Sequence, residues 1–173
     1  MTIELANKIP SSARQFARAG RKLLLEPGAA FLMCRMAFWV TVFSVAVRLA
    51  PLPRALQLIS TSLRKRSDEP QKSVQDRLGQ SIDRVLATRL LTLKPVCWKR
   101  AAILHRYLSL NGIATRVVFG LSNGTDGVVS GHAWLEANGI PILEFEVPEY
   151  TRTYSFPSNE LFDAQLNLLP HEE

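Results

Sequence analysis

The sequence predicts an α+β fold in which one central helix packs on a small antiparallel sheet, with additional N-terminal helices. Residues 98–110 are apolar on most sides of a helix, which is typical of a helix at the centre of a domain. Residues 74–91 precede it with apolar residues at helical spacing. Segments 114–121 and 132–136 are predicted to be strands, separated by the Gly- and Ser-rich loop 122–131. With 173 residues, of which 47% are hydrophobic, the chain can build one core without disulfides or metal.

The N-terminal part is predicted to be helical and separate in character from the rest. Three helices are expected there: residues 13–26, about 28 to 49, and 54–63. The charged segment 64–73 contains Pro70 and is predicted to be a solvated linker. The chain therefore divides into basic and apolar helices over residues 1–66 and a core over residues 74–173.

The most apolar stretch, residues 31–47, is interrupted by Arg35 and closed by Arg48. A bilayer span needs about twenty apolar residues, so we predict a helix buried in the core and leave peripheral membrane contact as the alternative. The apolar part lies far from Met1 and no small-residue cleavage site follows it, which does not fit a secretory signal. We therefore expect a cytoplasmic protein.

Positive charge is concentrated in the N-terminal part. Residues 1–66 hold eleven Lys or Arg and two acidic residues, whereas the remainder holds ten basic and thirteen acidic residues. The basic half is the candidate for meeting an acidic peptide, anionic lipid or nucleic acid. Aromatic residues are not interleaved with this charge as single-strand binding requires, so no nucleic-acid partner is expected.

The two cysteines, Cys34 and Cys97, differ in their settings. No CxxC and no Cys/His pair at zinc-site spacing is present, so neither a disulfide scaffold nor a metal site is expected, and no cofactor is required. Cys97 follows Pro95 at the expected start of the central helix, where the helix dipole and free N–H groups favour a thiolate. Cys34 lies mid-helix among apolar residues and is expected to be packing. Cys97 is the candidate nucleophile.

The candidate base is chosen among three histidines. His105 lies eight residues after Cys97 on the same helix, about 12 Å away, which is too far for proton transfer. His171 lies near the C-terminal end of the chain. His132 begins the second strand, directly after the Gly-rich loop, and is the predicted base.

A carboxylate is expected on the return strand, where Glu144 is the candidate and Glu146 its rival. A two-residue turn at Asn138-Gly139 would place His132 and Glu144 on opposite faces of the hairpin. A three-residue loop that adds Ala137 pairs the two residues directly and separates polar from apolar side chains better, so we predict it. Glu144 would then fix the tautomer and stabilise the imidazolium. For either glutamate, an ordinary surface charge remains the other interpretation.

Donors for a developing oxyanion are also expected near the thiol. The backbone N–H of Cys97 is the first candidate. Gln80 and Arg84 on the preceding helix are both open as the second. Trp98 and Trp134 are predicted either to line the cleft or to pack beside it.

The strongest family signal is carried by the block PVCWKRAAILHRYLSLNGIATRVVFGLSNG, which is followed by GHAWLEANGIPI. This pattern resembles the transglutaminase-like cysteine peptidase of lasso-peptide biosynthesis, the B protein. That family shows a Cys followed shortly by an Arg and a leucine-rich helix, a small-residue turn such as NG, and an HAW[VL]E strand. The resemblance covers residues 80–146, and the break at residues 50–54 also looks like the opening of the stand-alone second half of split B proteins. It implies a papain- or transglutaminase-like core.

The resemblance also implies a function and partners. Cys97 falls on the family nucleophile and His132 on its base, whereas Glu144 stands where Asp is usual. The implied activity is removal of the leader from a ribosomally made precursor peptide. A separate leader-recognition protein would deliver the precursor, and an asparagine-synthetase-like cyclase would close the ring. Two alternatives stay open: a non-catalytic scaffold that presents the precursor to the cyclase, and a transglutaminase-like acyltransferase.

Overall fold

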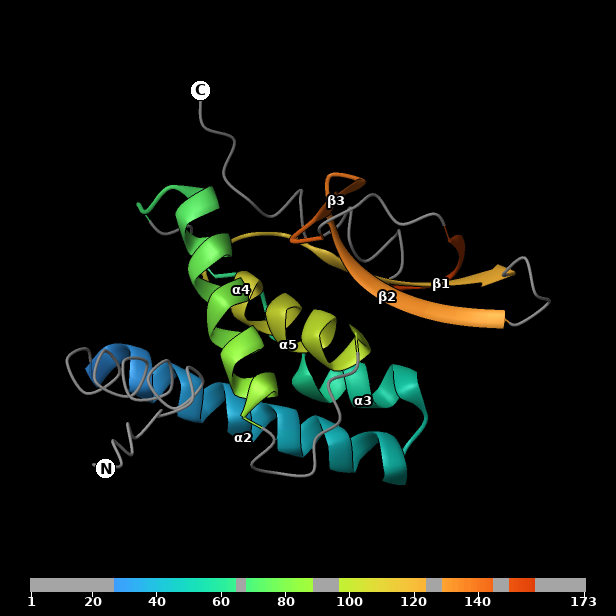
Figure 1. Ribbon diagram of the computed structural model, residues 1–173, viewed down its shortest axis with the longest axis horizontal. Coiled ribbons are helices and arrows are strands. Elements are labelled where there is room, and N and C mark those ends of the chain that lie inside the picture. Colours follow the sequence, from blue (N-terminus) through green and yellow to red (C-terminus); the bar gives the residue numbers. More distant parts are fainter. Residues whose placement is uncertain (1–26, 65–67, 89–96, 124–128, 145–149, 158–173) are drawn as a thin grey trace, which may run out of the picture.

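The computed structural model describes residues 27–64, 68–88, 97–123, 129–144 and 150–157 (Figure 1). In these residues it contains helices α2 (Pro27–Leu49), α3 (Leu52–Ile59), α4 (Gln71–Ala87) and α5 (Cys97–Leu110), and strands β1 (Arg116–Asn123), β2 (Val129–Ala137), β3 (Ile140–Ile142) and β4 (Thr151–Phe156). The predicted helix 13–26, Glu146 and His171 lie outside the described residues. The predicted α+β class, with a central helix, a small antiparallel sheet and N-terminal helices, is confirmed.

The four described strands form one antiparallel sheet in the order β3-β2-β1-β4. Its long hairpin pairs Asn123 with Val129, so the strands continue into the segment 122–131 that we predicted as a loop. The helices gather on one side of the sheet, and α5 is the helix that packs against both β1 and β2 (Figure 1). The helix predicted as central therefore lies between the sheet and the other helices.

One hydrophobic core joins all four described helices to the sheet. In α5, Ile103, Leu104 and Leu108 have no exposed surface, which explains why this helix is apolar on most sides. The N-terminal helices contribute fully or almost fully buried side chains to the same core: Met36, Val40, Phe43, Ala55, Leu56 and Ile59. The segment predicted as a linker thus separates two helical groups that share this core.

Helix α2 buries only one of its sides. Met36, Val40 and Phe43 face the core at helical spacing, whereas Phe31 is 64% exposed and Cys34 is exposed. The prediction that this segment is buried in the core, with Cys34 as packing, is therefore wrong for the side of the helix that carries Phe31 and Cys34. The physical reason is that, among the residues that the structure describes, α2 is the outer layer of the helical group and is covered from one side only (Figure 1). By length and composition alone, Gly28–Leu49 qualifies as a membrane-crossing helix, the one such helix in the described residues.

The turn between β2 and β3 corrects the predicted hairpin register. Asn138 and Gly139 have φ angles of 51° and 77°, and Ala137 pairs with Ile140. This is a two-residue turn, so the predicted three-residue loop is wrong. Two successive left-handed residues give a turn whose twist matches that of the flanking strands, and Asn-Gly is the sequence that favours it most.

His105 makes the stability of the fold sensitive to pH. The side chain is 4% exposed, its Nδ1 lies 3.0 Å from Thr115 Oγ1, and burial lowers its pKa from 6.5 to about 4. The unfolded chain binds this proton at a higher pH than the folded one. The free energy of unfolding should therefore fall as pH decreases from about 6.5 to about 4, by up to roughly 3 kcal/mol from this group. Urea unfolding across this range measures the loss.

The matched variant for this prediction is His105→Gln, which keeps a hydrogen-bonding side chain without a titrating group. Other groups titrate in the same pH range, so the informative quantity is the difference between the two proteins. The variant should lose less stability on acidification than the original chain. Equal pH dependence in both proteins would show that His105 does not carry the effect.

Candidate active site

Cys97 is the first residue of α5 and is half-buried as a free thiol. It lines a cavity of about 440 Å³ together with His132 of β2. Walls of the cavity also come from Leu52 of α3, Phe119 of β1 and Tyr154 of β4. The structure thus places the predicted nucleophile and the predicted base at one cavity, although 35 residues separate them in the chain.

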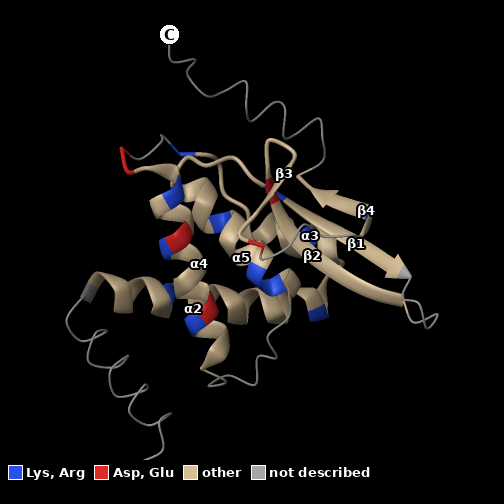
Figure 2. Ribbon diagram, turned by 45° about the horizontal axis from the view of Figure 1, so that its top comes forward, with Lys and Arg blue, Asp and Glu red and all other residues tan. Residues whose placement is uncertain are grey.

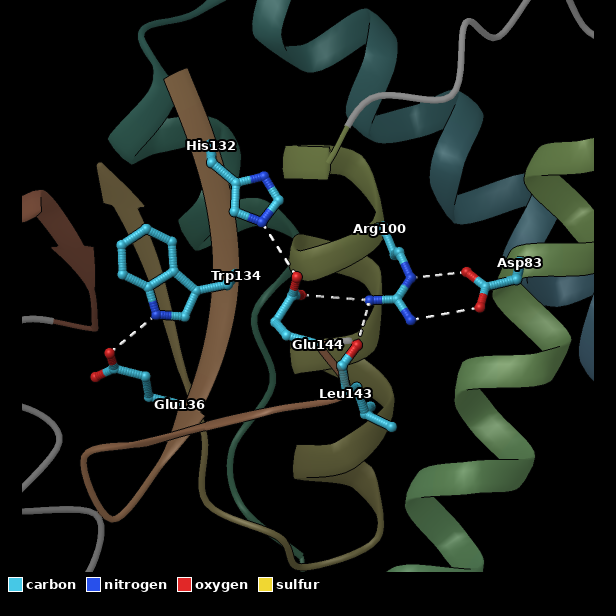
Figure 3. A network of polar contacts seen from close by, with 7 residues as sticks. All are labelled: Asp83, Arg100, His132, Trp134, Glu136, Leu143 and Glu144. Atoms are coloured by element: carbon cyan, nitrogen blue, oxygen red, sulfur yellow. Dashed lines mark hydrogen bonds and ion pairs between the residues drawn. The ribbon is translucent and has the colours of Figure 1, made fainter. Parts of the chain in front are cut away.

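Glu144 contacts the imidazole of His132. Its Oε2 lies 3.1 Å from Nε2 of His132. A dashed line marks this contact in Figure 3. Within the part of the chain that the structure describes, Nδ1 of His132 has no hydrogen-bond partner. When Nε2 carries the proton and donates it to the carboxylate, Nδ1 is left with a free lone pair. The ring then has the tautomer that can accept a proton from a thiol at the same cavity.

The route by which Glu144 reaches His132 differs from the predicted one. In the observed register β3 ends at Ile142, and Leu143 has a φ of 59°. This left-handed residue breaks the alternation of the strand and turns Glu144 towards the imidazole. Such a conformation costs a non-glycine residue about 1 kcal/mol or more, so contacts around it must hold it in place.

Arg100 supplies those contacts (Figure 3). Its Nη1 donates a hydrogen bond of 3.0 Å to the carbonyl oxygen of Leu143 and lies 3.6 Å from Oε1 of Glu144. Asp83 of α4 holds the other side of the guanidinium, with Oδ1 2.7 Å from Nε and Oδ2 3.3 Å from Nη2. The planar guanidinium suits this forked geometry. A chain of contacts therefore runs from α4 through Arg100 and Glu144 to His132.

Sequence reasoning did not identify Arg100 or Asp83 as site residues. The available signal was the position of Arg100, one helical turn after Cys97, which puts both on the same part of α5. Asp83 gave no local signal, because its role depends on how α4 packs against α5.

Aromatic rings pack against His132. The ring of Trp134 is stacked on the imidazole at a centroid distance of 6.0 Å, and the ring of Tyr150 lies at 5.3 Å. Gly120, which pairs with His132 on β1, makes room for both, since a Cβ there would lie 2.8 Å from Tyr150 Cβ and 2.9 Å from the Trp134 ring. These contacts restrict the rotation of the imidazole.

A hydrogen bond to a buried carboxylate holds the indole of Trp134 in place. Its Nε1 donates a hydrogen bond of 2.9 Å to Oε1 of Glu136, which is 1% exposed (Figure 3). The same oxygen lies 2.8 Å from Nη2 of Arg152 on β4. A buried carboxylate with these two partners fixes the indole that packs against His132.

The other predicted cleft residues lie in different places. Trp98 lines the cavity, whereas Trp134 is 2% exposed and packs behind the imidazole. Gln80 and Arg84 are exposed on α4, and neither is among the residues that line the cavity. Neither side chain therefore fits the role of second oxyanion donor in this arrangement. Within the described residues, no group of three or more His, Cys, Asp or Glu is placed to hold a metal ion.

A thiol at the start of a buried helix and an imidazole on the adjoining antiparallel sheet define the class of α+β proteins with a cysteine–histidine site. The family model of the transglutaminase-like superfamily matches residues 37–155, and the chain belongs to this superfamily. Its members are generally cysteine-dependent enzymes. The match includes Cys97, His132 and Glu144 and begins within α2. Neither the curated proteins nor the solved structures yielded a match to the chain.

Proposed function

We propose that this protein is a cysteine peptidase that removes the leader from a ribosomally made precursor during lasso-peptide maturation. The observation that carries the proposal is that Cys97 and His132 line one cavity while Oε2 of Glu144 lies 3.1 Å from Nε2 of His132. Membership of a superfamily of cysteine-dependent enzymes supports the reaction class. The precursor as substrate rests on the resemblance of the Cys97 and His132 segments to the lasso-peptide B protein.

In the proposed mechanism, Sγ of Cys97 attacks the carbonyl carbon of the scissile peptide bond. Nδ1 of His132 accepts the thiol proton and then delivers it to the leaving amine. The backbone N–H of Cys97 is the first donor to the oxyanion. Water, deprotonated by His132, then hydrolyses the thioester, which releases the carboxylic acid and restores the thiol. Glu144 stabilises the imidazolium in both steps.

The cavity suits an extended peptide. Thr153 and Tyr154 of β4 line it, and β4 is at one edge of the described sheet. An extended segment can add to such an edge through backbone hydrogen bonds while its side chains enter the pocket. The largely apolar walls, including Leu52 and Phe119, favour apolar side chains beside the scissile bond.

The proposal includes partners and a location. A separate leader-recognition protein would bring the precursor peptide to the cavity, and an asparagine-synthetase-like cyclase would take the released segment. These steps place the protein in the cytoplasm, where the precursor is made.

The test is incubation of the purified protein with its precursor peptide, with and without the leader-recognition protein, followed by mass spectrometry. The proposal expects two fragments whose masses sum to that of the precursor plus one water. Addition of a primary amine distinguishes acyl transfer, which would yield an amine adduct in place of the free acid. Intact precursor that binds and reaches the cyclase uncut would instead indicate the scaffold.

Arg100 is predicted to be a positioning residue for this reaction. Arg100→Met removes the support of the Leu143 carbonyl and of Glu144, so the imidazole loses its fixed orientation. We expect kcat to fall by about 10- to 100-fold with little change in KM, because Arg100 does not line the cavity. The kcat of Arg100→Lys should lie between those of the original protein and Arg100→Met, because an ammonium keeps the positive charge but cannot make the forked contacts of a guanidinium.

Two α4 variants serve as controls for Arg100. Asp83→Asn weakens one side of the guanidinium and should have a smaller effect than Arg100→Met. Arg84→Met removes the neighbouring exposed charge of the same helix and should leave kcat unchanged. If Arg84→Met and Arg100→Met lowered kcat equally, the loss would reflect the charge of the helices and not the position of Glu144.

A further inference from the structure

The exposed side of α2 carries large apolar side chains at regular spacing. Phe31, Phe38 and Val45 recur every seven residues and are 64%, 61% and 48% exposed, and Leu49 is 82% exposed. We call this side the outer face of α2; it consists of the exposed residues Phe31, Cys34, Arg35, Phe38, Thr41, Val45, Arg48 and Leu49. A row of large apolar side chains of this length on a protein surface marks a contact with another apolar phase.

The outer face is fixed in its orientation. Met36, Val40 and Phe43 on the opposite side have no exposed surface and belong to the common core. Rotation of the helix to hide Phe31 and Phe38 would expose these three residues. Among the described elements, α3, α4 and α5 all pack on the core side of α2 (Figure 1).

The charge around the outer face is wholly positive in the described residues 27–64. Arg35, Arg48, Arg54 and Arg64 are exposed there, and this stretch contains no Asp or Glu. In the four described helices all acidic residues lie on α4, as the red segments of Figure 2 indicate. An exposed protein face that combines large apolar side chains with arginines and no carboxylate can meet both the apolar and the anionic parts of a lipid surface.

We propose that the outer face of α2 binds the surface of an anionic membrane, with the helix axis parallel to the bilayer. Phe31, Phe38 and Val45 enter the boundary between headgroups and acyl chains, and the arginines meet lipid phosphates. The guanidinium of Arg35 lies 5.6 Å from the centre of the Phe31 ring, so its stem follows the apolar surface while its charge stays at headgroup level.

Two other arrangements fit the observations less well. Although 23 residues of helix extend about 35 Å, a span would pull Met36, Val40 and Phe43 out of the core and place Arg35 in hydrocarbon. A dimer formed through this face would bring two outer faces together. Both carry arginine and no carboxylate, so the two faces would repel each other. The membrane inference does not rest on the proposed peptidase activity.

The first test is sedimentation of the full chain with vesicles. We expect binding to vesicles of equal parts phosphatidylglycerol and phosphatidylcholine, weaker binding to phosphatidylcholine alone, and loss of binding at high salt. Phe38→Ser should weaken binding about tenfold or more. Ile140→Ser is the matched control, because Ile140 is 67% exposed but lies on β3.

The second test uses Cys34 as a reporter within the outer face. A polarity-sensitive fluorophore is attached to Cys34 in a Cys97→Ser background, so that one thiol remains. Its emission should shift to shorter wavelength when the phosphatidylglycerol vesicles are added, whether or not the protein cleaves any peptide. Absence of both sedimentation and shift overturns the inference. A dimer that Phe38→Ser dissociates, without vesicle binding, also overturns it and assigns the face to a second copy.

Discussion

The Cys97→Ala variant is expected to cleave the precursor at least about 10⁴-fold more slowly than the original protein. Cys97 provides the attacking atom of the proposed reaction, and methyl cannot replace it, so only binding and oxyanion stabilisation would remain. The rate is best measured under single-turnover conditions, with enzyme in excess of precursor and fragments quantified by mass spectrometry. Circular dichroism of the variant should be unchanged, because Cys97 is only half-buried.

The matched control is the other cysteine. Cys34 is exposed on α2 and does not line the cavity, so Cys34→Ala should keep the original rate. A Cys97→Ala variant that still produces both fragments would refute the assignment of the nucleophile. A protein that supports ring closure equally well with either cysteine replaced would be a scaffold.

The sequence predicted the burial of helix α5 better than that of helix α2. Helix α5 was predictable because it is apolar on most sides and ends at Asn111-Gly112, and Gly112 indeed has a φ of 74°. In α2, Phe38 is as apolar as Phe43, yet one is 61% exposed and the other fully buried. Periodicity cannot select the buried side of a helix that is apolar all round. Packing against α3, α4 and α5 makes that selection.

The site shows the same division between local and tertiary information. The placing of Cys97 at a helix start and His132 on a strand depends on local sequence, and both expectations hold. The pairing of His132 with Glu144 was expected from a register that the Asn138-Gly139 turn rules out. What brings the carboxylate to the ring is the left-handed Leu143, a conformation that leucine does not favour by itself.

Arg100 explains why that local preference is overridden. Its guanidinium is held by Asp83 and donates to the Leu143 carbonyl, so two helices impose the backbone conformation that aims Glu144. Contacts between segments 43 residues apart leave no periodic pattern in the chain. This is the general reason why the supporting residues of a site are harder to predict than the reacting ones.

Replacement of His132 by glutamine is expected to slow cleavage by about 10³- to 10⁴-fold. The glutamine amide can donate to Glu144 as Nε2–H does, so the pocket keeps its shape, but it cannot accept the thiol proton or return it to the leaving amine. Alkylation of Cys97 by iodoacetamide, followed in a Cys34→Ala background, should also become slower, since the thiol loses its base. This second readout needs no substrate and isolates the effect on the nucleophile.

The double variant then decides whether Cys97 and His132 act together. If the imidazole acts only by activating the thiol, its removal should not lower the rate further once Cys97 is alanine. The Cys97→Ala/His132→Gln protein should therefore be no slower than Cys97→Ala alone, as is usual for residues that form one catalytic unit. If the rate losses of the two single variants multiplied in the double variant, His132 would contribute to the rate independently of the thiol. The shared cavity would then hold two separate sites, and the proton transfer from Cys97 to His132 would have to be abandoned.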